Sequence, residues 1–290
     1  MTPTDTDRLL DRLETLLARA ERALARLDPD APASEPDWSA SAFRWRPPGR
    51  LEAVAHPHAV DLDALHGIER QKQALVRNTR QFLAGLPANN ALLWGARGTG
   101  KSSLIKALRT AYAGDGLRLI EVEAHHLVDL PDIVAPLYDR PERFVLFADD
   151  LSFESGDASY KALKAILEGS VAAPPDNVLV YATSNRRHLL PEYLDENREA
   201  RNVDGEIHHG DAVEEKISLS ERFGLWLSFH PFDQETYLAI VRAQLRELDA
   251  DIEDEAEMER AALQWALARG ARSGRAARQF ARDWSGRHGL

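Results

Sequence analysis

Residues Gly95 to Ser102 form the pattern G-x-x-x-x-G-K-S, whose chemistry is phosphate binding. The pattern follows the apolar run 91–94, typical of a strand, and precedes an apolar segment from Leu104 that is typical of a helix. Glycines let backbone N–H groups turn toward anionic oxygens, and a helix N-terminus adds partial positive charge. Lys101 is expected to reach the β- and γ-phosphates, and the Ser102 hydroxyl to bind Mg²⁺. This context predicts a nucleoside triphosphate site. The residues expected around the phosphates are Gly95, Ala96, Arg97, Gly98, Thr99, Gly100, Lys101, Ser102 and Ser103.

Two carboxylates follow an apolar run at 144–148 that is typical of a buried strand. Asp149 is placed to hold Mg²⁺ directly or through water, and Asp150 to polarise an attacking water as a general base. Asn185 stands at the end of the next expected strand. Its amide is able to contact the γ-phosphate or the water, although taken alone it is better explained as an ordinary polar loop residue.

The elements that must position these residues alternate from about residue 60 onward. Short apolar strands between helices predict a parallel sheet covered on both faces, in which ligands bind at the carboxyl ends of the strands. The candidate residues follow such strands. The strands are expected at 91–94, 117–122, 144–148, 178–182 and 225–229.

The chain is expected to divide into four segments. They are an amphipathic helix at 1–28, a proline-rich linker or arm at 29–59, an α/β nucleotide-binding domain at 60–232 and a helical lid domain at 233–290. Two roles explain the first helix equally well: packing on the chain's own core, and association with a partner or with another copy of the chain. The arm is expected to have little regular structure, because prolines interrupt it. An acidic insertion at 191–220 fits a solvated loop better than a mobile partner-binding element.

Over roughly residues 60–285 the chain resembles the AAA+ ATPases. Residues 95–102 resemble Walker A and 144–150 resemble Walker B. Within AAA+ it is similar to a bacterial family of stand-alone ATPases, without an assigned role, that is related to replication initiators and helicase loaders. Asn185 resembles sensor 1, Arg222 resembles the arginine finger and Arg275 resembles sensor 2. The segment 66–69, which begins with His66 and includes Gly67 and Ile68, resembles the segment that lines the adenine pocket.

The resemblance implies binding of MgATP and its hydrolysis to ADP and phosphate, coupled to conformational change on an unknown protein client. Asp150, Asn185 and Arg222 would be catalytic, with Arg222 supplied in trans, so a homo-oligomer is expected. Arg275 would report nucleotide state to the lid, and Arg278, one turn on, competes for that role. Most AAA+ proteins carry Glu at the position of Asp150, so slow hydrolysis is expected.

Two other functions fit parts of the sequence. One is an ATP-dependent loader or switch that acts on a nucleic-acid enzyme with little hydrolysis of its own. The other is a small-molecule kinase, because kinases also use this phosphate loop, but it leaves Arg222 and the lid unexplained.

Composition restricts the partners. The net charge of −11 disfavours a broad nucleic-acid-coating surface, although arginines between residues 269 and 287 leave a local basic patch open. The absence of cysteine excludes thiolate metal sites and cysteine nucleophiles. No apolar run is long enough to predict a membrane span, and the N-terminus lacks a signal pattern, so a cytoplasmic location is expected.

Overall fold

The computed structural model describes residues 35–46, 49–153, 158–168, 175–186, 201–203, 206–208 and 221–288. The helix expected at 1–28, and most of the insertion expected at 191–220, lie outside the described residues. Within the described part, no helix combines the length and the apolar composition that crossing a membrane requires.

A seven-stranded sheet forms the centre of the fold, with strand order β2-β1-β4-β5-β6-β3-β9. All neighbouring strands in it are parallel except β1 and β2, which pair antiparallel. The parallel sheet expected from the sequence is therefore confirmed, and β2 adds one antiparallel strand at its edge. The strands are β1 (Ala42–Arg46), β2 (Arg50–Ala53), β3 (Ala91–Gly95), β4 (Leu117–Glu121), β5 (Arg143–Ala148), β6 (Val178–Ser184) and β9 (Leu225–Phe229), and a separate antiparallel ladder joins β7 (Arg201–Val203) to β8 (Glu206–His208).

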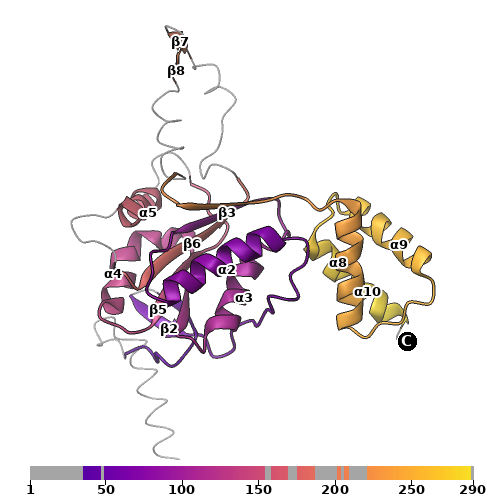
Figure 1. The fold of residues 1–290 in the computed structure, drawn as a ribbon, viewed down its shortest axis with the longest axis horizontal. Helices are drawn as coiled ribbons and strands as arrows, with labels where there is room; N and C mark the ends of the chain where they lie inside the picture. Colours follow the sequence, from indigo (N-terminus) through magenta and orange to yellow (C-terminus); the bar gives the residue numbers. More distant parts are fainter. Residues whose placement is uncertain are drawn as a thin grey trace, which may run out of the picture.

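Helices cover both faces of this sheet (Figure 1). Leu93 and Phe147 belong to the core under one helical layer, whereas their neighbours Leu92 and Leu146 belong to the core on the other face. Successive strand residues point to opposite faces, so a sheet buried on both sides needs continuous apolar strands. The helices are α2 (Glu69–Leu83) and α3 (Lys101–Tyr112) on the first face, and α4 (Leu130–Val134) and α5 (Ala158–Glu168) on the second, with 3₁₀ turns η1 (Ala124–Asp129) and η2 (Ala135–Leu137) on either side of α4.

The proline-rich arm has more regular structure than expected. Its strands β1 and β2 extend the sheet beyond β4, where Phe43 and Trp45 are buried and Arg44 pairs with Glu121 at 2.8 Å. The prediction of little regular structure was wrong. It was based on the prolines, and it gave too little weight to the short alternation of apolar and polar residues at 42–46, which is typical of a strand. The residues paired between β1 and β4 are 77 positions apart in sequence, so local patterns could not reveal the pairing.

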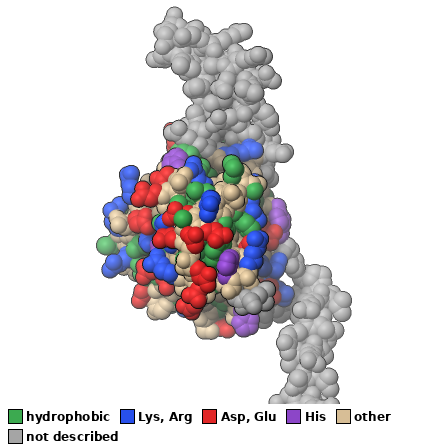
Figure 2. All heavy atoms as spheres, turned by 90° about the vertical axis from the view of Figure 1, so that its right-hand side faces the viewer, with side chains coloured by type: hydrophobic (Ala, Val, Ile, Leu, Met, Phe, Trp, Pro, Cys, Tyr) green, Lys and Arg blue, Asp and Glu red, His purple; other side chains and the backbone are tan. Residues whose placement is uncertain are grey.

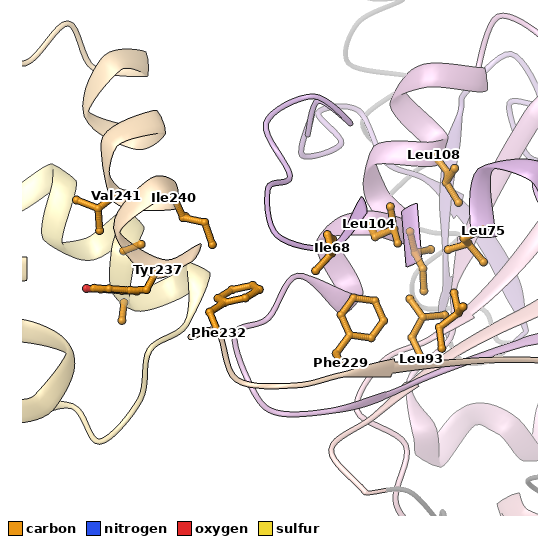
Figure 3. Packing of buried hydrophobic residues seen from close by; sticks show 14 of the residues in the cluster. Ile68, Leu75, Leu93, Leu104, Leu108, Phe229, Phe232, Tyr237, Ile240 and Val241 are labelled. Atoms are coloured by element: carbon orange, nitrogen blue, oxygen red, sulfur yellow. The ribbon is translucent and has the colours of Figure 1, made fainter. Parts of the chain in front are cut away.

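Three helices follow the sheet and stand beside it (Figure 1). Asp233 and Asp254 cap the first two by accepting backbone N–H bonds in the first turn. The apolar core runs without a break from the sheet into these helices, through Ile68, Phe229 and Phe232 to Ile240 (Figure 3). The lid helices are α8 (Gln234–Glu247), α9 (Glu255–Ala268) and α10 (Gly274–His288).

Candidate nucleotide site

The loop between β3 and α3 has the backbone geometry of an anion cradle. Gly95, Gly98 and Gly100 have φ angles of +131°, +73° and +100°, which residues with a Cβ rarely adopt. A Cβ on Gly95 would lie 1.9 Å from the carbonyl oxygen of Phe229, and Ala96 N–H donates to that same oxygen at 2.9 Å. The loop is thus held against the end of β9, at the start of α3.

Lys101 is buried at the first position of α3, with 7% of its surface exposed. Its Nζ donates to the carbonyl oxygens of Gly95 at 2.8 Å and Ala96 at 2.7 Å, and to Oδ1 of Asn185 at 3.2 Å. Burial lowers the pKa of the Lys101 ammonium, although the charges of Asp150 and Asp149 oppose this. The structure therefore holds a cation where the loop meets the end of β6.

The two residues expected to bind Mg²⁺ are adjacent in space. Ser102 Oγ donates to Asp149 Oδ1 at 2.6 Å, although the two residues are 47 positions apart in sequence. A hydroxyl and a carboxylate are oxygen ligands of the kind that Mg²⁺ prefers. Ser102 and Asp149 therefore fit a magnesium ion.

Thr183, at the carboxyl end of β6, organises both carboxylates. Its Oγ1 donates to Asp149 Oδ1 at 2.5 Å and accepts from the N–H of Asp150 at 2.9 Å. Asp150 has a φ of +52°, so the turn it occupies is strained. Sequence reasoning assigned no role to Thr183. The signal available was a hydroxyl at the end of an otherwise apolar strand, since a buried hydroxyl needs a partner.

Asp150 and Asn185 are in direct contact. The Nδ2 of Asn185 donates to Oδ1 of Asp150, so the expected base and the expected sensor share one hydrogen bond. Arg97 lies 4.0 Å from Asp150 Oδ2, but both side chains are mostly exposed, so this ion pair is weak.

The lid helix α10 begins against the phosphate loop. Arg275 N–H donates to the carbonyl oxygen of Gly98 at 3.3 Å. A Cβ on Gly98 would lie 3.0 Å from Ser273 Oγ and 3.1 Å from Arg275 Cβ. The phosphate loop and the start of α10 are therefore in direct contact.

A cavity of about 1160 Å³ lies between the loop, the carboxyl ends of the strands and the lid. This volume is slightly above the range of about 300–1000 Å³ that is typical of ligand sites, so the cavity is large enough for a nucleotide. Arg275 and Arg278 both line it, so position alone does not choose between them as the lid sensor. The expected site residues that line it are Ile68, Arg97, Gly98, Thr99, Gly100, Lys101, Ser102, Ser103, Asp149, Asp150, Asn185 and Arg275.

Four expected site residues do not line the cavity. Gly95 and Ala96 lie behind the loop, against β9. Gly67 has a φ of +75° and packs on the first turn of the lid, where a Cβ would lie 2.6 Å from a methyl carbon of Thr236. The fourth is Arg222, which precedes β9.

Arg222 stands at the opposite end of the sheet from the phosphate loop. Strands β3 and β9 are parallel, with Ala91 opposite Leu225 and Gly95 opposite Phe229. At about 3.3 Å per residue, this register separates Arg222 from the loop by roughly 20 Å. Arg222 therefore cannot reach phosphates that are bound in the cavity of its own chain.

Two lid faces also line the cavity, and sequence reasoning singled out only Arg275 and Arg278 among their residues. Ile240, Gln244 and Glu247 share one face of α8, and Gln244 Nε2 donates to Glu247 Oε2 at 2.9 Å. Arg278 and Arg282 continue the line of Arg275 along α10. The spacing was visible in the sequence, but only packing shows which face of a helix meets a cavity.

Charges of both signs are interspersed on the lid side of the molecule (Figure 2). Among the residues drawn in colour there, Lys and Arg do not gather into one continuous patch. This face does not resemble the basic surface that typically tracks a nucleic-acid backbone.

The sequence family described as "Protein of unknown function (DUF815)" matches residues 38–288. The chain belongs to this family. Curated protein sequences gave no match.

Solved structures with a similar fold include RuvB of Thermotoga maritima, described as a Holliday junction branch migration motor. RuvB is 19% identical with a TM-score of 0.52, and the match covers 77% of this chain. Two mutants of the same RuvB have TM-scores of 0.52 and 0.51, also at 19% identity and 77% coverage. The matched region spans 63% of the RuvB chain, or 64% for the second mutant. The AAA+ fold expected from the sequence is thus confirmed.

Proposed function

We propose that this protein binds ATP with Mg²⁺ and hydrolyses it to ADP and phosphate. The observation that carries the proposal is the convergence of Lys101, Ser102, Asp149, Asp150 and Asn185 at one end of the sheet. These residues come from three separate segments of the chain, and each has the chemistry that phosphoryl transfer to water requires.

Each part of the site has a distinct role in this proposal. The loop N–H groups and Lys101 bind the phosphates, and Ser102 and Asp149 hold Mg²⁺. Bound Mg²⁺ supplies positive charge to the phosphate oxygens. Asp150 orients or deprotonates the attacking water, and Asn185, bonded to it, fixes the direction of the carboxylate.

Arg222 completes the site from a neighbouring subunit. It lies at the far end of β9 from its own phosphate loop, so it would serve the site of the next copy in a ring or filament. A guanidinium group supplied in this way accelerates phosphoryl transfer by about 10³–10⁵-fold. The proposal therefore includes a homo-oligomer.

Hydrolysis would be coupled to movement of the lid. The contact between Gly98 and the start of α10 joins the phosphate loop to the lid, and Arg275 and Arg278 face the shared cavity. Loss of the γ-phosphate would change the contacts on both sides of this junction. This movement would act on a client protein, whose identity does not follow from the sequence.

A switch or loader that binds ATP and hydrolyses it slowly is the second candidate. It is favoured by Asp150, whose carboxylate is one methylene shorter than that of Glu and is already bonded by Asn185. RuvB is described as a motor on Holliday junctions. For this chain, ATP-dependent and salt-sensitive DNA binding would indicate a comparable partner, but the net charge of −11 argues against it.

Steady-state ATP hydrolysis as a function of protein concentration tests the proposal. Specific activity is expected to rise with concentration in the wild type and to fall by about 10³-fold or more in Arg222→Ala, with ATP affinity unchanged. Arg70→Ala, at an exposed position on α2, is the matched control. Tight ATP binding with negligible hydrolysis at every concentration would favour the switch.

A further inference from the structure

Arg109 is a buried cation that the proposed mechanism does not use. It lies on α3, eight residues after Lys101, and only 6% of its surface is exposed. Among the described residues no carboxylate forms an ion pair with it, and burial lowers the pKa of its guanidinium group. A buried charge is costly unless hydrogen bonds compensate for it, so its partners indicate why it is there.

These partners belong to the N-terminal arm and to the cavity. Arg109 donates to Ser41 Oγ at 3.0 Å, just before β1, and to the carbonyl oxygen of His58 at 3.1 Å. It also donates to Thr110 Oγ1 at 3.1 Å, and that oxygen accepts from Val60 N–H at 3.4 Å. Two consecutive residues of α3 therefore hold the chain at residues 58 and 60.

The segment His58 to Asp61, here called the wall segment, lines the cavity. It belongs to no helix or strand, so no ladder of backbone hydrogen bonds sets its position. The helix that holds it is the same helix whose first turn carries Lys101 and Ser102. The distance between the phosphate loop and the wall segment is thus set through α3.

We propose that Arg109 is a positioning residue for the nucleoside part of the ligand, because it holds the wall segment in register with the phosphate loop. This inference rests on the proposed function. The planar guanidinium bridges Ser41 and His58 at once, which the single ammonium of a lysine cannot reproduce with the same geometry. Without Arg109 the triphosphate still binds, but the wall segment is no longer fixed in the position that nucleoside binding requires.

Arg118 provides a matched control. It is half-buried on β4 and also ties the arm to the body, since it donates to the carbonyl oxygens of Trp38 at 3.3 Å and Ala113 at 3.0 Å. It does not line the cavity. Loss of Arg118 therefore removes an arm contact without a direct effect on the wall segment.

The test is calorimetric titration of the full-length protein with MgATP and, separately, with inorganic tripolyphosphate and Mg²⁺. Arg109→Met is expected to weaken ATP binding by about tenfold, equivalent to one lost anchoring interaction, and tripolyphosphate binding much less. Arg109→Lys should fall between the wild type and Arg109→Met. Arg118→Met should leave the ratio of the two affinities unchanged. Thr110→Val, at an exposed position, should shift the ratio in the same direction without threatening the fold.

The two ligands separate the possible failures. An equal loss for both ligands in Arg109→Met, no loss for either, or the same change of ratio in Arg118→Met would overturn the role of Arg109. If wild-type protein bound neither ligand, the proposed function itself would fail. If the wild type bound both and only the ratio prediction failed, the proposed function would stand.

Discussion

Thr183 shows how a single buried side chain can set the geometry of two acidic groups. Thr183 is 1% exposed, and its hydroxyl donates to the carboxylate of Asp149 and accepts from the backbone N–H of Asp150. These bonds direct one carboxylate toward Ser102 and hold Asp150 in its positive-φ turn. Residues that orient the groups at a metal site typically matter by about 10–100-fold in metal affinity or activity.

Thr183→Val is expected to reduce the rate of ATP hydrolysis by about 10–100-fold, because valine keeps the shape and removes both bonds. Thr79→Val is the control, since Thr79 is equally buried and bonds Leu75 and Tyr181 away from the cavity. Each substitution should cost about 1–3 kcal/mol of unfolding free energy. Equal hydrolysis rates in the two variants would show that Thr183 has only a structural role.

The burial of Lys101 leads us to expect an unusual dependence of ATP affinity on pH. Phosphate binds the ammonium form, and burial lowers the pKa of this group from its ordinary value of 10.5. Affinity should therefore fall as pH rises, beginning below the pH at which an exposed lysine would lose its proton. Binding titrations from pH 7 upward would measure this, with circular dichroism to check folding at each pH. Lys101→Arg, whose guanidinium stays charged, should bind more weakly but without the fall. A wild-type affinity that stayed constant through pH 10 would contradict this assignment.

At the scale of elements, the junction between the phosphate loop and α10 depends on Gly98. A Cβ there would both strain a backbone with φ of +73° and press against Ser273 and Arg275. The loop and the lid therefore approach each other closely only because this residue has no side chain.

Gly98→Ala is expected to weaken ATP binding and to displace the lid. Gly116→Ala is the matched control, because Gly116 has a φ of +91° but nothing within 4 Å of an added Cβ. Both variants should lose about 1–2 kcal/mol of stability from backbone strain. Only Gly98→Ala should also lose ATP affinity and alter hydrogen exchange along α10. The same ATP affinity in both variants would show that the junction is not needed for binding.

The elements were predictable from the sequence where their patterns are local. The strand, loop and helix around Gly95 to Ser102 and the strand before Asp149 follow from apolar runs and glycines. The hairpin β1–β2 was missed, because short strands flanked by prolines are stabilised by pairing with β4, far away in the chain. Propensity is a weak guide where such long-range pairing decides the structure.

The candidate site was predictable where a motif carries its own geometry. Lys101, Ser102 and Asp149 lie together as their motifs imply. Gln244 and Arg282 could not be assigned to the cavity, because that depends on how the lid sits against the sheet. Arg109 was missed for a similar reason, since its partners are distant in sequence and only burial reveals their importance.

At the scale of the whole molecule, the two ends of the sheet have different roles in the proposed function. The cavity lies at the carboxyl ends of the strands, and Arg222 lies near the start of β9 at the other end. This polarity suits head-to-tail assembly, in which the arginine end of one copy meets the cavity of the next. Activity would then belong to the interface rather than to a single chain.

Mixing two inactive variants tests this claim most directly. Lys101→Ala is expected to lose phosphate binding and keep Arg222, and Arg222→Ala is expected to keep phosphate binding without the arginine. Each alone should be inactive, and the mixture should recover a measurable part of wild-type hydrolysis, because mixed interfaces contain one complete site. A mixture as inactive as its parts, while crosslinking shows that both variants enter the same assemblies, would contradict the account.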